Sequence, residues 1–215
     1  MMQEALDSSL RILALVRHGE SEWNAKNVWT GLVDVGLTEK GKEEAKSAAR
    51  LLLDVSFDVG FTSRLKRATE SLRIIVEELH VSNIPIFDDP ALNERNYGVY
   101  TGKNKLEIKA QLGDAEFLKL RRGWDYPIQN GESLKQVYDR VIPYYEKTIL
   151  PKLIEGKNVL VVAHGNSLRA LMKNIEHISD TDIPFVELAT GEIVLYYVDQ
   201  SGTLVRREKR MVHHS

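Results

Sequence analysis

The sequence predicts an α/β fold in which a mostly parallel central sheet carries helices on both faces. Hydrophobic residues make up 43% of the 215-residue chain and charged residues 28%, which is typical of a globular protein. Two uninterrupted apolar runs, 12–16 and 159–163, are typical of strands that are buried on both faces. Helical periodicity follows most strand candidates, and strands that alternate with helices favour a parallel sheet.

The first half of the chain provides three of the predicted strands. Residues 12–16 form the first, and a turn-rich connection leads to a helix over 38–53 that a threonine can cap. A short strand over 57–61 runs into a helix that Ser63 is expected to cap. A brief third strand follows at 85–87.

Irregular and helical stretches fill the middle of the chain. Residues 88–102 lack a regular period, and two short helices are expected at 105–111 and 114–120. Proline, asparagine and glycine mark 125–131 as a loop. A long helix over 133–149 follows, and the proline inside it can kink it.

The last third begins with the most apolar strand, 159–163, and a helix starts directly after it. Two late strands are expected at 193–198 and 203–208, joined by a polar turn. Because strands and helices alternate along most of the chain, the helices are expected to cover both faces of the sheet.

The chain as a whole limits the classes of function. No linker divides it, so we expect one catalytic domain over 10–205, with a loose leader at 1–9 and a polar tail at 206–215. A net charge of −2 gives no reason to expect nucleic acid or a membrane as partner. No apolar run reaches the roughly 18 residues that cross a bilayer. The absence of cysteine excludes disulfides and thiolate catalysis, and the expected location is the cytoplasm.

Two histidines, His18 and His164, occur in the same context, because each follows an apolar strand and precedes a glycine. The carboxyl ends of parallel strands meet at one edge of a sheet, where ligands bind in α/β folds. Either histidine alone can be a loop residue that hydrogen-bonds to the backbone. The repetition favours a shared site.

Basic residues around these histidines indicate a phosphoryl group as ligand. Arg17 adjoins His18, and Arg67 lies near the start of the helix after strand 57–61. Helices expected after His18, Ser63 and His164 supply free N–H groups. A guanidinium matches two phosphate oxygens at once. A metal site is the rival interpretation, but the sequence contains no HExxH motif or acidic triad.

A phosphate at this place gives the neighbouring residues chemical roles. Neutral His18 can attack phosphorus and become a phosphohistidine. Glu94, in the irregular segment, is the acid/base candidate, because a nearby phosphate anion favours its protonated form. The ordinary alternative is an exposed loop glutamate. Lys105 with Arg121-Arg122 can form a second anion site, although adjacent arginines are more often solvated helix surface.

An ordered set of motifs extends from about Leu10 to about Val198. Its members are Arg17-His18-Gly19-Glu20, Asn24, Thr30-Gly31, Arg67, Glu94-Arg95-Asn96-Tyr97-Gly98, Arg121-Arg122 and Ala163-His164-Gly165-Asn166-Ser167-Leu168-Arg169-Ala170. This set resembles the cofactor-dependent phosphoglycerate mutases of the histidine phosphatase superfamily. The Arg-His-Gly motif alone marks only the superfamily, whereas the ordered set is more specific.

The resemblance implies roles for individual residues. His18 would be the phosphorylated nucleophile, and Glu94 would give and take the proton of the substrate hydroxyl. Three residues would hold the transferring phosphoryl group: Arg17, Arg67 and His164. Further phosphate contacts would come from Asn24, Thr30, Gly31, Gly165 and Asn166. Contacts to the rest of the substrate would come from Ser21, Arg95, Tyr97, Lys105, Arg121 and Arg122.

The resemblance also implies the reaction. The enzyme would be primed by 2,3-bisphosphoglycerate and would interconvert 3-phosphoglycerate and 2-phosphoglycerate without a metal. A histidine phosphatase that hydrolyses a small phosphoester through the same phosphohistidine is the alternative, and a non-catalytic binding relative is a third. Longer family members carry more residues where only 124–131 separates Gly123 from Glu132 here. The oligomeric state, monomer or homo-oligomer, is therefore left open.

Overall fold

The computed structural model describes residues 10–81, 83–190 and 192–211. Within these residues, six strands form one sheet in the order β3-β2-β4-β1-β5-β6. The strands are β1 (Arg11–Arg17), β2 (Val59–Thr62), β3 (Ile86–Asp88), β4 (Val159–Ala163), β5 (Glu192–Val198) and β6 (Leu204–Met211). Strands β3, β2, β4 and β1 pair in parallel, and β5 pairs antiparallel with both β1 and β6. The predicted mostly parallel sheet is confirmed.

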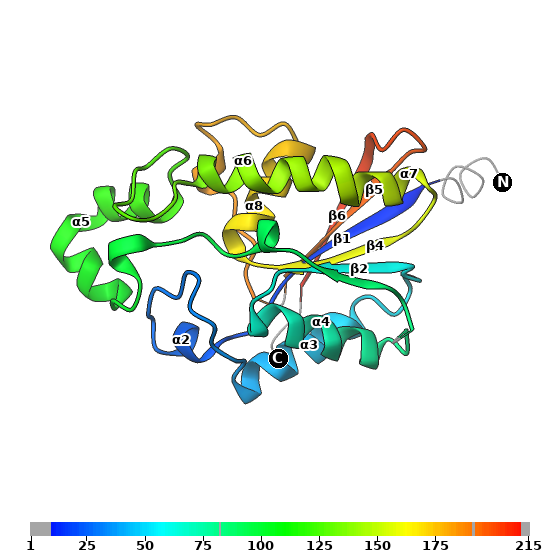
Figure 1. Cartoon of the computed structure of the whole chain (residues 1–215), viewed down its shortest axis with the longest axis horizontal. Helices are drawn as coiled ribbons and strands as arrows, with labels where there is room; N and C mark the ends of the chain where they lie inside the picture. The colour runs from blue at the N-terminus through cyan, green and yellow to red at the C-terminus, as the bar shows by residue number, and fades with distance from the viewer. Residues whose placement is uncertain (1–9, 82, 191, 212–215) are drawn as a thin grey trace.

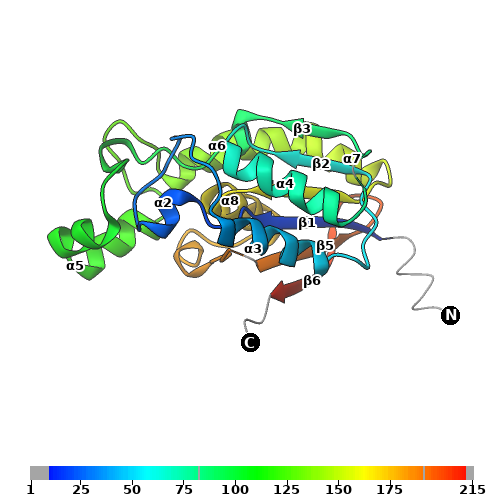
Figure 2. The ribbon, with the colours of Figure 1, turned by 90° about the horizontal axis from the view of Figure 1, so that it is seen from below.

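Helices cover both faces of this sheet, as predicted. The described part of the chain contains the helices α2 (Glu22–Ala25), α3 (Glu39–Arg50), α4 (Lys66–Glu78), α5 (Lys105–Arg122), α6 (Leu134–Tyr144), α7 (Leu150–Ile154) and α8 (Gly165–Ile175). Helices α3 and α4 lie on one face, and α6, α7 and α8 lie on the other (Figure 1). Figure 2 shows the same arrangement from below, with α3 and α4 in front of the strands.

Alternation along the central strands divides the core between the two faces. In β1, Leu13 and Leu15 pack with α6, α7 and α8, whereas Ala14 and Val16 pack with α3 and α4. All four side chains are at most 1% exposed. A strand with no polar face is what a parallel sheet covered on both sides requires. The central position of β1 and β4 places both histidine motifs in the middle of one sheet edge.

A third apolar cluster lies beyond that edge and supports α5. It consists of Trp29, Tyr97, Ile108, Phe117, Leu120 and Ile128. The backbone breaks inside α5 at Gly113, which has a φ of 76° and a ψ of 165° and so joins two helices, as predicted. In Figure 1, α5 extends past the strand ends on the same side as α2. This cluster therefore holds α5 over the end of the sheet at which the two histidines lie.

Two predicted details of the fold are wrong. Ser63 does not cap α4, because that helix begins three residues later and has Leu65 at its N-cap position. The Ser63 hydroxyl instead accepts from the Leu65 N–H and contacts His164 Nε2. Residues 206–211 are not a tail, because they belong to β6 and pair with β5. The predicted leader at 1–9 and residues 212–215 lie outside the described residues.

The predicted long helix over 133–149 has an interruption after its proline. Helix α6 ends at Tyr144, and a π-helical turn (Tyr145–Ile149) connects it to α7. Pro143 has no N–H to donate to the preceding turn, which favours such an irregularity. Short 3-10 helices are Pro90–Leu92, Gly98–Tyr100 and Ile183–Phe185. No helix in the described part of the chain is long and apolar enough to cross a membrane.

Candidate active site

The site begins where β1 ends, and a close backbone approach explains its glycine. The His18 N–H donates to the Ala163 carbonyl (3.0 Å), which ties the tips of β1 and β4 together. A Cβ atom at Gly19 would lie 2.0 Å from the carbonyl oxygen of Gly41, at the start of α3. Only glycine fits there, and the contact fixes the chain directly after the histidine.

The His18 ring is held in one tautomer. Its Nδ1 lies 2.6 Å from the Gly19 carbonyl oxygen, which can only accept, so Nδ1 carries the proton and Nε2 keeps a lone pair. The side chain is 2% exposed. Burial, and then repulsion from Arg67 and Arg17, lowers the pKa of His18 well below its usual value, against the opposing effect of the Gly19 carbonyl. The imidazole is therefore neutral at pH 7 and has a free nitrogen for nucleophilic attack.

His164 lies next to His18, so the structure brings the two histidines together as the repeated motif predicts. The two ring centroids are 4.9 Å apart in an edge-to-face arrangement. Nε2 of His164 lies 2.6 Å from the Ser63 hydroxyl, and its buried Nδ1 has no partner among the described residues. Burial, followed by repulsion from Arg67, lowers the pKa of His164 below its usual value. Three segments that follow β1, β2 and β4 thus converge on one point.

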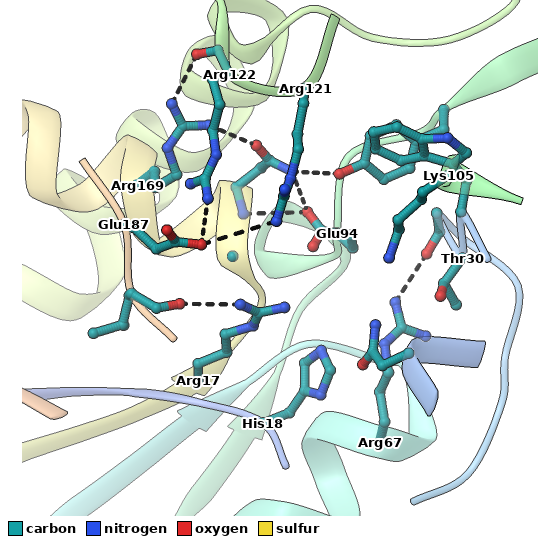
Figure 3. A pocket seen from close by; sticks show the side chains of 17 residues that line it. Arg17, His18, Thr30, Arg67, Glu94, Lys105, Arg121, Arg122, Arg169 and Glu187 are labelled. Carbon is teal, nitrogen blue, oxygen red and sulfur yellow. Dashed lines mark hydrogen bonds and ion pairs between the residues drawn. The ribbon is translucent and has the colours of Figure 1, made fainter. Parts of the chain in front are cut away.

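A single cavity opens above these histidines, and Figure 3 shows the side chains around it. The lining residues are Arg17, His18, Asn24, Trp29, Thr30, Gly31, Arg67, Glu94, Tyr97, Lys105, Arg121, Arg122, Gly165, Asn166, Arg169, Glu187 and Leu188. Most of the predicted site residues are therefore brought together. Ser21, Arg95 and His164 are not in the lining; His164 is fully buried next to His18. Ser21 caps α2, whereas buried Arg95 donates to the carbonyls of Leu120 and Arg121.

The cavity is strongly cationic. Among the described lining residues, six are arginine or lysine and two are carboxylates, Glu94 and Glu187. Burial lowers the pKa of Lys105 to about 8, and repulsion from Arg121 and Arg17 acts in the same direction. Such a concentration of like charges is unfavourable without an anion. The cavity is therefore suited to a ligand with several negative charges.

Several buried polar atoms in the lining lack a hydrogen-bond partner within the described residues. They are Arg17 Nε, Trp29 Nε1, Thr30 Oγ1 and Arg169 Nε. An unpaired buried donor costs roughly 1–3 kcal/mol, so such atoms mark places where a ligand or water completes the structure. Arg67 is different, because it donates to the carbonyls of Gly31 and Val33 (both 2.9 Å) and so also positions that loop.

Glu94 is held by one of its two carboxylate oxygens. Oε1 accepts from the Arg95 N–H (2.8 Å), from the Asn166 N–H (3.2 Å) and from Asn166 Nδ2 (3.0 Å). A Cβ added at Gly165 would lie 3.8 Å from both Glu94 Oε2 and the guanidinium carbon of Arg17. Gly165 thus keeps space open between them, and Oε2 is available for proton transfer.

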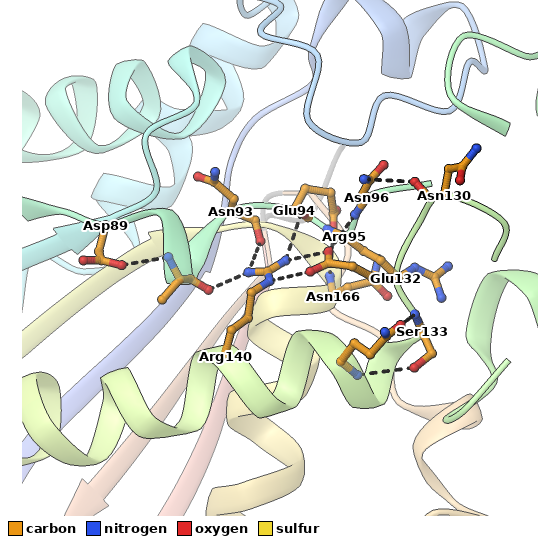
Figure 4. A network of polar contacts seen from close by, with 12 residues as sticks. Asp89, Asn93, Glu94, Arg95, Asn96, Asn130, Glu132, Ser133, Arg140 and Asn166 are labelled. Atoms are coloured by element: carbon orange, nitrogen blue, oxygen red, sulfur yellow. Dashed lines mark hydrogen bonds and ion pairs between the residues drawn. The ribbon is translucent and has the colours of Figure 1, made fainter. Parts of the chain in front are cut away.

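A partly buried network of polar contacts positions the Glu94 segment (Figure 4). Arg140 of α6 donates to the carbonyls of Ala91 (2.6 Å), Asn93 (3.1 Å) and Glu94 (3.1 Å). It also pairs with Glu132, whose other contact is the Asn96 N–H (2.8 Å). One side chain therefore holds three backbone carbonyls of the irregular stretch that carries Glu94.

Four residues in the lining had no role predicted from the sequence: Trp29, Arg169, Glu187 and Leu188. Arg169 stands one helical turn after Asn166 and donates to its side chain (3.0 Å), so the spacing within the His164 motif was the available signal. Trp29 adjoins Thr30, but no periodic pattern marks it. Glu187 lies in an irregular segment before β5, and only the fold brings it to Arg122.

Comparison with known proteins agrees with this geometry. The model of the histidine phosphatase superfamily (branch 1) matches residues 13–209. The chain therefore belongs to the histidine phosphatase superfamily.

Curated relatives identify the family within this superfamily. A 2,3-bisphosphoglycerate-dependent phosphoglycerate mutase of Cytophaga hutchinsonii is 50% identical over 185 residues, which are 86% of this chain and 86% of the relative. A protein of the same name from Parvibaculum lavamentivorans is 45% identical over 199 residues, 92% of this chain and 95% of the relative. Within the superfamily, the chain belongs to the family of these mutases.

Solved structures show the same fold. Bacillus stearothermophilus YhfR matches with a TM-score of 0.79 and 29% identity over 91% of this chain and 94% of that chain. A mycobacterial glucosyl-3-phosphoglycerate phosphatase matches with a TM-score of 0.80 over 95% of this chain and 100% of that chain. At 22% identity the second likeness concerns the fold alone.

Proposed function

We propose that the protein interconverts 3-phosphoglycerate and 2-phosphoglycerate through a phosphohistidine at His18. One observation carries the proposal: a single cavity joins a phosphoryl pocket at His18 to a second cationic end at Lys105, Arg121 and Arg122. Figure 3 shows Glu94 between these two ends. A small acid with a phosphate at one end and a carboxylate at the other fits this distribution of charge.

The residues present also fit 2,3-bisphosphoglycerate, because the unpaired buried donors and the excess of cations require an anion with several charges. When bound, this cofactor supplies the phosphoryl group that first loads His18. Arg17, Arg67, Thr30 and Asn24 would hold that group, and Arg121 and Arg122 would hold the other end.

The chain's own residues then carry the transfer. The phosphoryl group passes from Nε2 of His18 to the free hydroxyl of the substrate, and Glu94 takes the hydroxyl proton. In the return step, Nε2 attacks the other phosphate, the bond from phosphorus to the ester oxygen breaks, and Glu94 returns the proton to that oxygen. Arg17, Arg67 and His164 would stabilise the charge on the transferring group. This mechanism uses no metal.

The alternative is hydrolysis, in which water instead of a hydroxyl accepts the phosphoryl group from His18. The pocket at His18 serves both reactions, so the second cationic end decides between them. Binding the substrate at both ends holds its hydroxyl near the phosphohistidine and excludes water.

An enolase-coupled assay from 3-phosphoglycerate, with and without 2,3-bisphosphoglycerate and in the presence of a chelator, tests the proposed function. We expect isomerisation that depends on the bisphosphate and outpaces phosphate release. Faster phosphate release would favour the phosphatase. Absence of both would favour a binding protein.

Labelled 2,3-bisphosphoglycerate tests the nucleophile directly. The wild-type protein should acquire acid-labile, base-stable label, and His18→Ala should acquire none. His18→Ala removes the attacking nitrogen and leaves the arginines in place. Label on that variant would contradict the assignment of His18.

A further inference from the structure

The carboxylate of Glu187 occupies the second cationic end of the cavity. It forms an ion pair with Nη2 of Arg122 and lies 4.0 Å from Nη2 of Arg121. The Arg122 side chain is 13% exposed, whereas that of Glu187 is 50% exposed, so the carboxylate approaches from the solvent side. Figure 3 shows Glu187 between Arg122 and Arg17.

Two arginines of the cavity, Arg122 and Arg17, hold the segment around Glu187. Arg122 donates to the Val186 carbonyl (3.4 Å), and Arg17 donates to the Leu188 carbonyl (3.1 Å). Glu187 therefore has a defined position on the rim of the cavity. Both arginines belong to the groups that the proposed function assigns to substrate anions.

Glu187 is a negative charge at neutral pH. Its partial burial opposes ionisation, but the hydrogen bond and attraction to Arg122, with Arg121 and Arg17 nearby, lower its pKa below the usual value. A substrate carboxylate or second phosphate that binds Arg121 and Arg122 must displace this carboxylate or share the arginines with it.

We propose that Glu187 is a built-in competitor for the substrate's second anionic group and limits the affinity of the site for highly charged ligands. This inference rests on the proposed function and adds a specificity-determining residue to it. The product carries as much charge as the substrate and must leave the site. The Glu187 carboxylate can pair with the arginines again as the product leaves, which favours product release. The penalty should grow with the charge of the ligand, because it is electrostatic.

The test is calorimetric titration of Glu187→Gln, in a His18→Ala background that prevents phosphoryl transfer. The ligands are inorganic phosphate, 3-phosphoglycerate and 2,3-bisphosphoglycerate, in order of rising charge. Because partly exposed ion pairs are weak, Glu187→Gln should bind 3-phosphoglycerate about threefold more tightly. The gain should be larger for the bisphosphate and smallest for phosphate.

Two controls make the result specific. Glu43→Gln removes an equal charge from an exposed ion pair with Lys46 on α3 and should leave all three affinities unchanged. In an Arg122→Gln background, Glu187→Gln should give less than half of its gain, because its main partner is absent.

Unchanged or weaker binding by Glu187→Gln would overturn the proposal, as would equal gains for all ligands or in both backgrounds. Because binding is measured without turnover, these outcomes are independent of whether the enzyme isomerises or hydrolyses its substrate. The enolase-coupled assay reports separately on the proposed function.

Discussion

At the scale of single residues, the site depends on titratable side chains whose pKa values are shifted by burial. His18 is neutral because it is buried next to Arg67 and Arg17, and a backbone carbonyl fixes which of its nitrogens is free. The nucleophilic role that we propose for His18 thus relies on its surroundings rather than on a separate general base. The same surroundings make Lys105 easier to deprotonate than an exposed lysine.

The pH dependence of substrate affinity should show the state of Lys105. Its pKa of about 8 means that its positive charge is present below pH 8 and is lost as the pH rises through that value. The KM for 3-phosphoglycerate should therefore rise severalfold between pH 7 and 9, a range in which the phosphate charge is nearly constant.

The matched variant is Lys105→Arg, because arginine keeps its charge throughout this range. Its KM should change little between pH 7 and 9. Equal rises in both proteins would show that another group titrates.

Sequence alone predicts those site residues that follow a strand or stand in a local motif. Arg17, His18, Arg67 and His164 all lie within a few residues of a strand end, where topology brings them together. Glu187 and Trp29 reach the cavity through loop paths that no local pattern encodes. Arg95 was expected among the substrate-binding residues, but α5 packs over it and its guanidinium supports the Arg121 backbone instead.

At the scale of elements, the site is positioned by contacts between backbones that are far apart in the sequence. Gly19 packs on the start of α3, and the Gly19 N–H donates to the Ser71 hydroxyl of α4 (3.1 Å). Periodicity predicted these helices. It could not predict that α4 begins after Leu65, because Ser63 contacts His164 instead of capping the helix.

Gly19→Ala should destabilise the protein by more than about 1 kcal/mol, because overpacking against backbone atoms forces α3 or the His18 loop to move. Urea unfolding monitored by circular dichroism measures the change. Gly36→Ala is the control, since its Cβ would meet nothing closer than 3.7 Å. Equal stability of the two variants would contradict the close-packing explanation.

We expect Arg140 to act through Glu94 as a positioning residue. Arg140→Lys keeps the charge but cannot donate to three carbonyls and to Glu132 together. We expect kcat to fall by about tenfold to a hundredfold with a smaller change in KM, since misplacing a catalytic group affects mainly the chemical step.

The control for Arg140 is Arg50→Lys on α3, where the ion pair with Glu78 is long and exposed. A purely structural role of Arg140 would lower the melting temperature without changing kcat at 25 °C. That outcome would contradict the assignment of Arg140 as a positioning residue.

At the scale of the whole molecule, the cavity gathers cations that the fold must hold together without a ligand. Burial lowers the pKa of Arg67, Arg121 and Arg169, and repulsion from neighbouring arginines acts in the same direction. Anion binding relieves this repulsion, so ligand affinity and stability are linked.

3-Phosphoglycerate should therefore raise the melting temperature. At about 100 times its dissociation constant, this ligand adds about 2.7 kcal/mol to the free energy of unfolding. Arg121→Gln should melt higher than the wild type without the ligand and respond less to it. Lys46→Gln, on α3 and outside the cavity lining, should respond as the wild type does. An equal response to 3-phosphoglycerate in all three proteins would place binding elsewhere.

The last described strand has a consequence for how molecules of this protein meet one another. Within the described residues, β6 is an edge of the sheet, and its sequence is a run of charged side chains: Arg206, Arg207, Glu208, Lys209 and Arg210. An exposed strand edge is a template on which another chain can add a strand, and consecutive charges make such an addition costly. Arg210 also binds Asp54 after α3 (2.8 Å), which holds the end of the strand against its own domain. The charged stretch thus completes the sheet of its own chain and protects it against edge-to-edge aggregation.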